Sequence, residues 1–198
     1  MILTEVSAPP AEALPVRAFA DHLRLGSGFA DDGSLDAVLE LYLRAAMAAI
    51  EARIGRVLLS RPFSWTLTRW REDASQGLPI GPVRSVEGIA LVSADGTAEE
   101  VPSEAWSVLR DIQRPRLVGR FGRSLPRIPR GGHAEVRFTA GYGEAWEATP
   151  ADLRQAVFLL AAHYYETRSD AGGPSGGMPF GVLVLIEAFR ATRLGGGL

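Results

Sequence analysis

The side chains that most often carry chemistry in proteins are few in this sequence and far apart. The three histidines, His22, His133 and His163, lie at wide spacing. His163 and Glu166 share a helical face, but the helical zinc signature needs two histidines four residues apart with an adjacent glutamate. With no cysteine, the chain cannot form a thiolate metal cluster, a disulfide framework or a cysteine nucleophile. We interpret the histidines as structural and expect no metal site.

Motifs for phosphate binding and nucleophilic catalysis are also missing. The glycine strings 26–28 and 119–122 match neither the phosphate-loop nor the dinucleotide-binding pattern, and they are typical of turns. No serine stands in a nucleophile elbow, and the carboxylates are too scattered to nominate an acid–base pair. The sequence therefore predicts a protein without enzymatic activity, catalytic residues or a cofactor.

One segment has a strong charge. Residues 110–130 hold seven arginines and the single acid Asp111, a local charge of 7 minus 1, or +6. Three prolines and a closing glycine pair favour a long extended loop over a helix. Arginine forms forked hydrogen bonds with carboxylates and phosphates. A solvated loop, a contact with acids of a neighbouring subunit and a contact with nucleic acid phosphates are all compatible with this segment.

Composition limits the classes of protein to consider. The 198 residues are 46% hydrophobic, which suffices for a packed core. The formal net charge of −2 gives no overall attraction to nucleic acid or to an anionic membrane. All 21 basic residues are arginine, which codon bias in a GC-rich genome explains better than selection at every site. Residues 1–10 do not resemble a secretory signal, and the apolar run 182–186 is too short to span a bilayer. We expect a protein kept in aqueous solution, with no membrane partner.

Helical patterns occur at both ends of the chain. Residues 16–25 form a short helix that stops before Gly26. A long helix over Ser34–Ile54 begins with a capping serine, carries Asp36 in its first turn and ends at Gly55. Near the C-terminus, Thr149 and Pro150 predict the capped start of a helix over residues 151–168, and residues 180–193 form a last helix.

The long helix is apolar around more than half of its circumference, so it requires cover on two sides. It is either the central helix of its own domain or a helix with one side against another subunit. The apolar residues around this helix include Leu35, Val38, Leu39, Tyr42, Leu43, Ala46 and Ile50.

Between the helical ends, the hydrophobic period changes from 3.6 to two. Alternating aromatic and polar residues predict a strand from residue 61, and further strands are expected over 83–92, 97–101, 106–109 and 134–140. Asp95-Gly96 favours a hairpin turn. Residues 61–145 therefore form a β region of about five strands.

Together these patterns predict an α+β protein in which the N- and C-terminal segments form a helical bundle and an antiparallel β region is inserted between them. Residues 1–14 form an extended N-terminal arm. The discontinuous helical core comprises residues 15–60 and 148–193. The β insert, with its arginine-rich loop, spans residues 61–147, and residues 194–198 are a tail.

A series of short landmarks runs through nearly the whole chain in a fixed order. The landmarks are Leu14-Pro15-Val16, His22-Leu23-Arg24-Leu25, Asp31-Asp32, Glu51-Ala52-Arg53-Ile54-Gly55-Arg56-Val57-Leu58-Leu59, Trp65-Thr66-Leu67, Pro79-Ile80-Gly81-Pro82-Val83, Ser85-Val86, Phe138-Thr139-Ala140-Gly141-Tyr142-Gly143, Pro150-Ala151-Asp152-Leu153-Arg154-Gln155-Ala156, His163-Tyr164-Tyr165-Glu166-Thr167-Arg168 and Phe189-Arg190-Ala191-Thr192-Arg193-Leu194. The order of these landmarks resembles the head-to-tail connector, or neck adaptor, proteins of long-tailed phages and gene transfer agents. The linker 169–177 departs from the pattern, because family members vary there.

This resemblance implies a structural role without catalytic residues. It implies a homo-oligomeric ring, commonly a dodecamer, that docks under the portal protein and above the next neck or tail component, a stopper or tail terminator, with DNA passing through the lumen. Assembly would take place in the bacterial cytoplasm, and the mature location would be the neck of the particle, whether phage or gene transfer agent.

The resemblance also implies positions for the contacts. The long helix would pack against the neighbouring subunit of the ring through its seven apolar residues named above, from Leu35 to Ile50. The portal contact falls on the C-terminal residues Arg190, Arg193, Leu194 and Leu198. The arginine segment is expected on the lumen or against a neighbouring protein, through Arg114, Arg116, Arg120, Arg123, Arg127 and Arg130. The alternative function is a free nucleic-acid-binding protein that uses residues 110–130.

Overall fold

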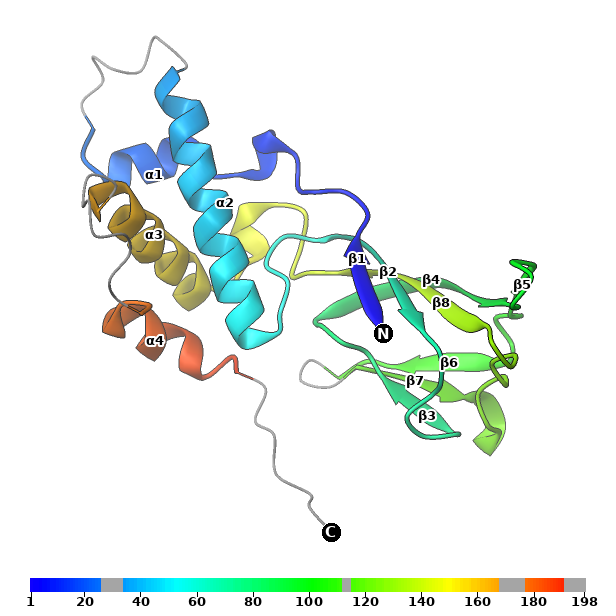
Figure 1. Cartoon of the computed structure of the whole chain (residues 1–198). Helices are drawn as coiled ribbons and strands as arrows, with labels where there is room; N and C mark the ends of the chain where they lie inside the picture. Colours follow the sequence, from blue (N-terminus) through cyan, green and yellow to red (C-terminus); the bar gives the residue numbers. More distant parts are fainter. Residues whose placement is uncertain (26–33, 112–114, 168–176, 191–198) are drawn as a thin grey trace. The chain divides into compact units, whose positions relative to one another are not determined.

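The computed structural model describes residues 1–25, 34–111, 115–167 and 177–190, which form two compact units (Figure 1). One unit, here the β unit, comprises residues 1–8 and 60–142. The other, the helical unit, comprises residues 9–59 and 143–198. The predicted α+β class is confirmed. In the described residues, we find no helix with both the length and the apolar character needed to cross a membrane.

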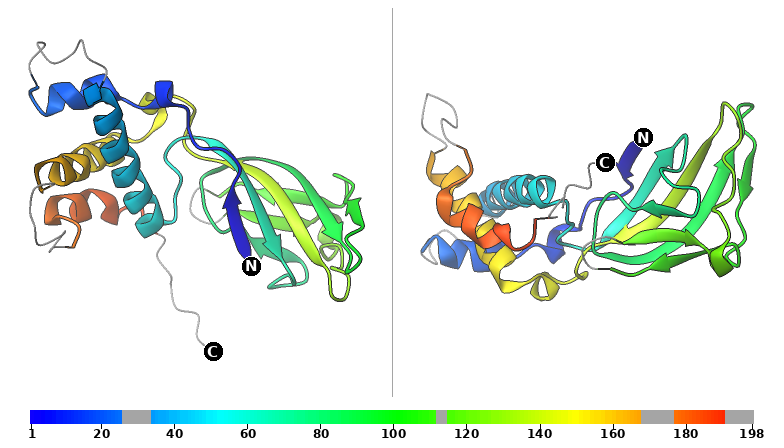
Figure 2. Two further views of the ribbon diagram at one scale, coloured as in Figure 1. Left: turned by 45° about the horizontal axis from the view of Figure 1, so that its top comes forward. Right: turned by 90° about the horizontal axis from the view of Figure 1, so that it is seen from below.

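The helical unit contains four α-helices, among its described residues, and two short 3-10 turns. The helices are α1 (Val16–His22), α2 (Ser34–Ile54), α3 (Ala151–Glu166) and α4 (Phe180–Glu187), and the turns are η1 (Ala11–Ala13) and η4 (Trp146–Ala148). Helix α3 packs against both α2 and α4, as the views in Figure 2 also show, whereas α1 packs on α2. Leucines and alanines of α3 meet the apolar side of α2 in the core, where Leu153 and Leu160 are buried.

The ends of these helices show which local signals decide them. Helix α2 has the predicted bounds, and Gly55 closes it with a φ of 68°, where a side chain would be strained. Helix α3 begins at Ala151, but Thr149 does not cap it; the Thr149 hydroxyl instead donates to the carbonyl of Leu58 at 3.4 Å. Helix α1 ends at His22, three residues before the predicted end.

Helices α3 and α4 are also shorter than predicted. Helix α3 ends at Glu166 rather than at residue 168, which lies outside the described residues. Helix α4 ends at Glu187, although the prediction extended to residue 193. The Arg56 side chain, which is 4% exposed, donates from Nε to the carbonyl of Phe189 at 2.7 Å. This bond fixes the chain beyond α4 against the segment that follows α2.

The β unit contains two antiparallel sheets. The first has the strand order β1-β2-β8-β4-β5, and the second has the order β3-β7-β6. The strands are β1 (Ile2–Glu5), β2 (Arg61–Leu67), β3 (Ser75–Gly77), β4 (Val83–Val92), β5 (Ala98–Glu100), β6 (Trp106–Leu109), β7 (Arg116–Gly119) and β8 (His133–Ala140). The predicted strands over residues 83–92 and 106–109 have the observed bounds, and the strand from residue 61 begins where predicted. Strand β8 begins one residue before the predicted 134, and β5 is one residue shorter at each end than the predicted 97–101.

Three short strands, β1, β3 and β7, were not predicted. Residues Ile2–Glu5 belong to the segment predicted as an extended arm, and they pair with β2 as a strand. Strand β7 lies inside the arginine-rich segment predicted as a long loop, and it pairs with both β3 and β6. A strand of three or four residues is too short to display a two-residue period, so pairing with a neighbour decides its structure.

The core of the first sheet is built from the alternating strand β2. Phe63, Trp65 and Leu67 are buried, whereas the side chains between them are more exposed. Phe63 lies opposite Phe138 of β8, and their rings stack with centroids 5.7 Å apart. Strand β8 pairs with β2 on one side and with β4 on the other, so it is the centre of this sheet.

Candidate interaction surfaces

The seven residues of α2 assigned to ring packing divide into two sets. Leu39, Leu43, Ala46 and Ile50 are fully buried inside the helical unit. They are therefore core residues of the subunit itself. Leu35 and Tyr42 are half-buried, and the Tyr42 ring meets the Tyr165 ring of α3 edge-on. Among the seven, Val38 alone is exposed.

A second apolar face of α2 points away from this core. It is formed by Val38, Leu41, Ala45, Ala48 and Ala52, all exposed, and we call it the α2 stripe. Leu41 is 65% exposed. At about 100° per residue, the five positions fall within an arc of about 80° that holds no charged side chain. The alternating spacing of three and four residues could have revealed this face from the sequence.

Helix α4 has an exposed apolar face as well. Its residues before Glu187 are all uncharged, and Val182 and Ile186 on one side are buried. On the other side Phe180 is 80% exposed and Val184 is 58% exposed, followed one turn later by the exposed Ala188. We call Phe180, Val184 and Ala188 the α4 face; it was not among the predicted contacts.

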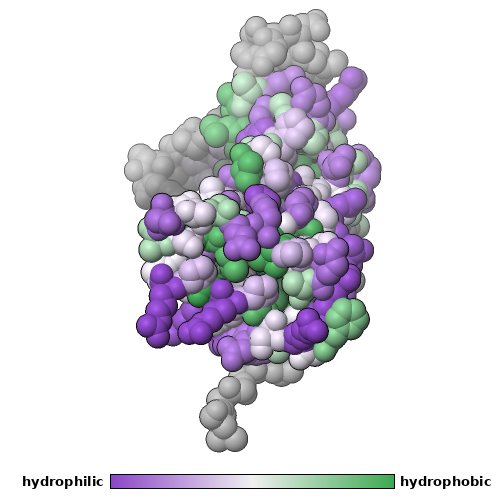
Figure 3. All heavy atoms as spheres, turned by 90° about the vertical axis from the view of Figure 1, so that its right-hand side faces the viewer, coloured by the Kyte–Doolittle hydropathy of each residue, from purple (hydrophilic) through white to green (hydrophobic). Residues whose placement is uncertain are grey.

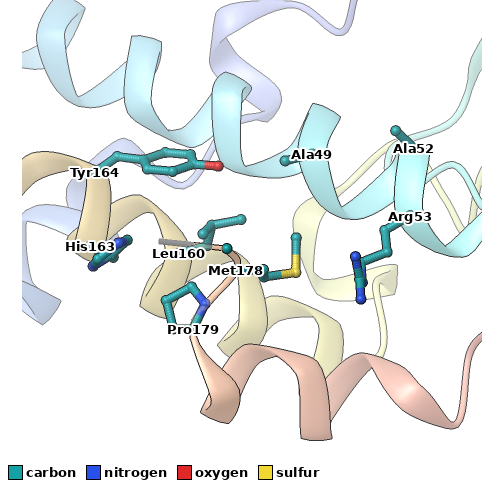
Figure 4. A pocket seen from close by; sticks show the side chains of 9 residues that line it. Ala49, Ala52, Arg53, Leu160, His163, Tyr164, Met178 and Pro179 are labelled. Atoms are coloured by element: carbon teal, nitrogen blue, oxygen red, sulfur yellow. The ribbon is translucent and has the colours of Figure 1, made fainter. Parts of the chain in front are cut away.

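A groove of about 670 Å³ lies between α2, α3 and the residues before α4. Figure 4 shows Arg53 of α2 and Tyr164 of α3 on opposite sides of the groove, with Met178 between them. The groove is lined by Ala49, Ala52, Arg53, Leu160, His163, Tyr164, Gly177, Met178 and Pro179. This lining holds no carboxylate and no nucleophile–base pair. Nowhere in the described ranges do three or more histidine or acidic side chains gather as metal ligands do.

Within the arginine segment, Arg116 has a structural role. Its Nη2 donates to the Glu72 carboxylate at 2.7 Å and to the Ser75 hydroxyl at 2.6 Å. The hydrogen bond from Ser75 and the nearby Arg116 charge lower the pKa of Glu72 from its ordinary value of 4.5. These bonds join β7 to the turn before β3. Arg114 lies outside the described residues.

The remaining predicted arginines, Arg120, Arg123, Arg127 and Arg130, are exposed. None of these four guanidinium groups forms an ion pair with an acid in the part of the chain that the structure describes. Hydrophilic side chains also prevail on the face of the molecule in Figure 3, where hydrophobic residues form separate patches. These arginines are available for an external anionic partner.

An aromatic residue lies between two of these arginines. Phe121 is 89% exposed and has a φ of 54°. This left-handed conformation is energetically unfavourable for a residue with a large side chain. Backbone hydrogen bonds fix the turn from both ends: Arg120 N–H donates to Ala105 at 3.1 Å, and Leu125 N–H donates to Asp73 at 2.7 Å. A lone aromatic between arginines has no periodic pattern, so the sequence did not indicate it.

The predicted portal contacts lie at the C-terminal end. Arg190 is the one described member of that set, and its Nη1 forms an ion pair with Glu187 at 3.0 Å, at the end of α4. Arg193, Leu194 and Leu198 lie outside the described residues.

Comparison with solved structures identifies the class of protein. The chain is similar over its full length to a chain in the neck of an empty gene transfer agent particle computed with C6 symmetry, with 53% identity, a TM-score of 0.89 and 99% of that chain covered. A chain in the neck of a native gene transfer agent particle computed with C12 symmetry is 48% identical, with a TM-score of 0.85 and 99% coverage. A chain of the virion of a native gene transfer agent particle is 52% identical, with a TM-score of 0.87 and again 99% coverage. No protein-family model and no curated protein matches the chain.

Exposed apolar and basic faces, together with these full-length similarities, define a structural component of a virion neck. The chain belongs to the family of neck proteins found in gene transfer agent particles. The symmetry of the similar neck structures supports a homo-oligomeric ring in the particle.

Replacing Leu43 by alanine will lower the free energy of unfolding by about 2–5 kcal/mol, because it removes a fully buried leucine from the subunit core. Replacing Leu41 by alanine, two residues away on the opposite, exposed side of α2, will change the free energy of unfolding by no more than about 0.5 kcal/mol. Chemical denaturation of the two variants measures both values. Equal losses of unfolding free energy in the two variants would show that Leu41 is as buried as Leu43, contrary to this assignment of the two sides of α2.

Replacing Arg116 by glutamine will lower the melting temperature slightly, since it removes the partner of Glu72. The matched change Arg127→Gln, at an exposed arginine, will leave it unchanged. Because the folded pKa of Glu72 is lowered, its contribution to stability is present above pH 4.5 and is lost as the pH falls through the folded pKa. The difference between wild type and Arg116→Gln should therefore shrink at acidic pH in thermal melts; a constant difference would assign it to another cause.

Proposed function

We propose that this protein is the head–tail adaptor of its particle: a ring subunit under the portal that joins the DNA-filled head to the neck or tail. The observation that carries the proposal is the full-length similarity, at 48–53% identity, to chains of gene transfer agent necks and virions. The ordered landmarks of the sequence, which resemble adaptor proteins from residue 14 to residue 194, support the position directly below the portal.

The proposed ring contains twelve copies. Support comes from the twelvefold symmetry of one similar neck structure, with which the sixfold symmetry of the other is compatible. Above the ring lies the portal, below it a stopper or tail terminator, and DNA passes through the lumen. The subunits assemble in the bacterial cytoplasm and remain in the particle neck. The helical core of residues 15–60 and 148–193 forms the ring, and the β insert of residues 61–147 contacts a further partner.

The C-terminal residues 190–198 provide the portal contact in this proposal. Arg190 supports it, because its guanidinium is exposed at the end of the described chain, beside Glu187. Arg193, Leu194 and Leu198 follow with a charged and apolar character suited to a protein groove.

Removing residues 193–198 will abolish binding to the purified portal protein, because it deletes the apolar and arginine side chains that dock there. Binding is measured by co-sedimentation of the two full-length proteins, with the Leu109→Ala chain as a control of similar stability. Undiminished binding by the truncated chain would refute the portal contact while leaving the position in the neck untouched.

The exposed arginines favour a contact with DNA in the lumen or with acidic groups of the next neck protein. They are also the observation that favours the second candidate function, a free nucleic-acid-binding protein. A free binder would show an affinity for DNA that falls steeply with salt, because each phosphate contact releases counterions.

Changing Arg120, Arg123 and Arg127 together to glutamine will reduce the fraction of particles that retain DNA or carry tails, counted by electron microscopy. A control chain with the exposed Arg17, Arg24 and Arg84 changed to glutamine loses the same charge outside this surface and should assemble normally. Normal particles from the first variant would rule out the arginine contact. If the isolated wild-type chain binds DNA with a steep salt dependence that the first variant loses, the second candidate is favoured.

A further inference from the structure

The helical unit exposes two apolar faces of different shape. The α2 stripe is lined with small side chains, because three of its five members are alanine. The α4 face carries the large side chains Phe180 and Val184. Helix α4 is apolar on nearly every side, yet the subunit buries only one side of it. Apolar faces of this kind, rimmed by polar residues, are typical of protein interfaces.

A ring that closes by rotation needs such a pair. Every subunit contacts the next through two different surfaces, one on each side, and these two surfaces must be complementary. Small side chains allow a neighbouring helix to approach closely, whereas a phenylalanine buries about 150–250 Å² in a matching depression. The α2 stripe and the α4 face have these complementary properties on one chain.

We propose that the α4 face of each subunit packs on the α2 stripe of the next subunit in the ring, an inference that rests on the proposed ring function. Phe180 and Val184 of one copy lie over Ala45, Ala48 and Ala52 of its neighbour. Ala52 also borders the groove of about 670 Å³, which offers space for the Phe180 ring at the end of the stripe.

Charges at the rims of the two faces match this pairing. Arg53 is exposed beside Ala52 at the C-terminal end of α2. Glu187 is exposed beside Val184 on α4, and its side chain is 65% exposed even with its local Arg190 partner. Opposite charges across the rim of an interface favour one orientation of the partners.

The absence of cysteine from the chain allows a direct test by disulfide formation. Val184→Cys is co-expressed in the producing cell with Ala45→Cys, Ala48→Cys or Ala52→Cys, each as a full-length chain, and purified particles are oxidised. We expect disulfide dimers from at least one mixture, and monomers from particles that contain a single variant. Mixtures of Val184→Cys with Leu109→Cys, an exposed position of the β unit, should yield no dimers.

The outcomes separate the inference from the proposed function. If mass spectrometry finds the chain in particles but no mixture forms dimers, the α2–α4 contact is wrong and the ring stands; these faces then meet the portal or another neck protein. Dimers of Ala48→Cys alone would also overturn the contact, since they indicate a twofold arrangement. If the chain is absent from particles, the proposed function fails and the contact with it.

A second variant tests the contact without a disulfide cross-link. Phe180→Asp places a carboxylate at the first position of α4. A negative charge there interacts favourably with the helix dipole, so the subunit should remain folded. It should enter particles at least tenfold less than wild type, as quantified by mass spectrometry. Leu109→Asp, at an exposed leucine of the β unit, should enter normally. Incorporation of Phe180→Asp at the wild-type level would overturn the proposed contact.

Discussion

The architecture of the helical unit depends on the burial of one long helix with few charges on its sides. Helix α2 places Leu39, Leu43 and Ile50 in the core, and α3 covers that side. Its charged residues other than Arg53 gather on a strip, where Glu40 pairs with Arg44 at 2.7 Å and Arg44 also donates to the carbonyl of Pro9. The remaining arc, the α2 stripe, is apolar and exposed, with no cover from the described part of the subunit. Intramolecular packing and an unsatisfied external face are thus properties of the same helix.

In the β unit, the packing around β7 holds a charged turn in a fixed conformation. Strand β7 contributes the buried Leu117, and its Arg116 is occupied by Glu72 and Ser75. Gly119 permits the chain to reverse, since a Cβ there would lie 1.9 Å from the carbonyl oxygen of Arg123. The arginines beyond it therefore remain on the surface although they follow a strand directly. Separating structural from available arginines required the pairing of β7, which the local sequence does not encode.

Sequence reasoning was most accurate where a period extends over many residues. The bounds Ser34–Ile54 and Val83–Val92 were predicted as observed, because long apolar patterns and clear end signals agree there. Strands β1, β3 and β7 are too short for such a pattern. On α2, apolar residues around more than half of the helix could not show which side faces the core, and Leu41 was missed for that reason. The resemblance to neck proteins came from the order of many landmarks, which carries information that no single segment holds.

The low affinity of each apolar face explains why subunits need not associate before they reach the particle. A stripe made mainly of alanines buries little area per contact, and association must first offset the loss of translational and rotational freedom. One α2–α4 contact between two free subunits is therefore marginal. In a closed ring every subunit makes two such contacts, and docking on a symmetric partner brings neighbours to a high effective concentration. Large, flat apolar faces on a free subunit would promote aggregation. The small faces here become strong enough to hold neighbouring subunits together only once a template aligns them.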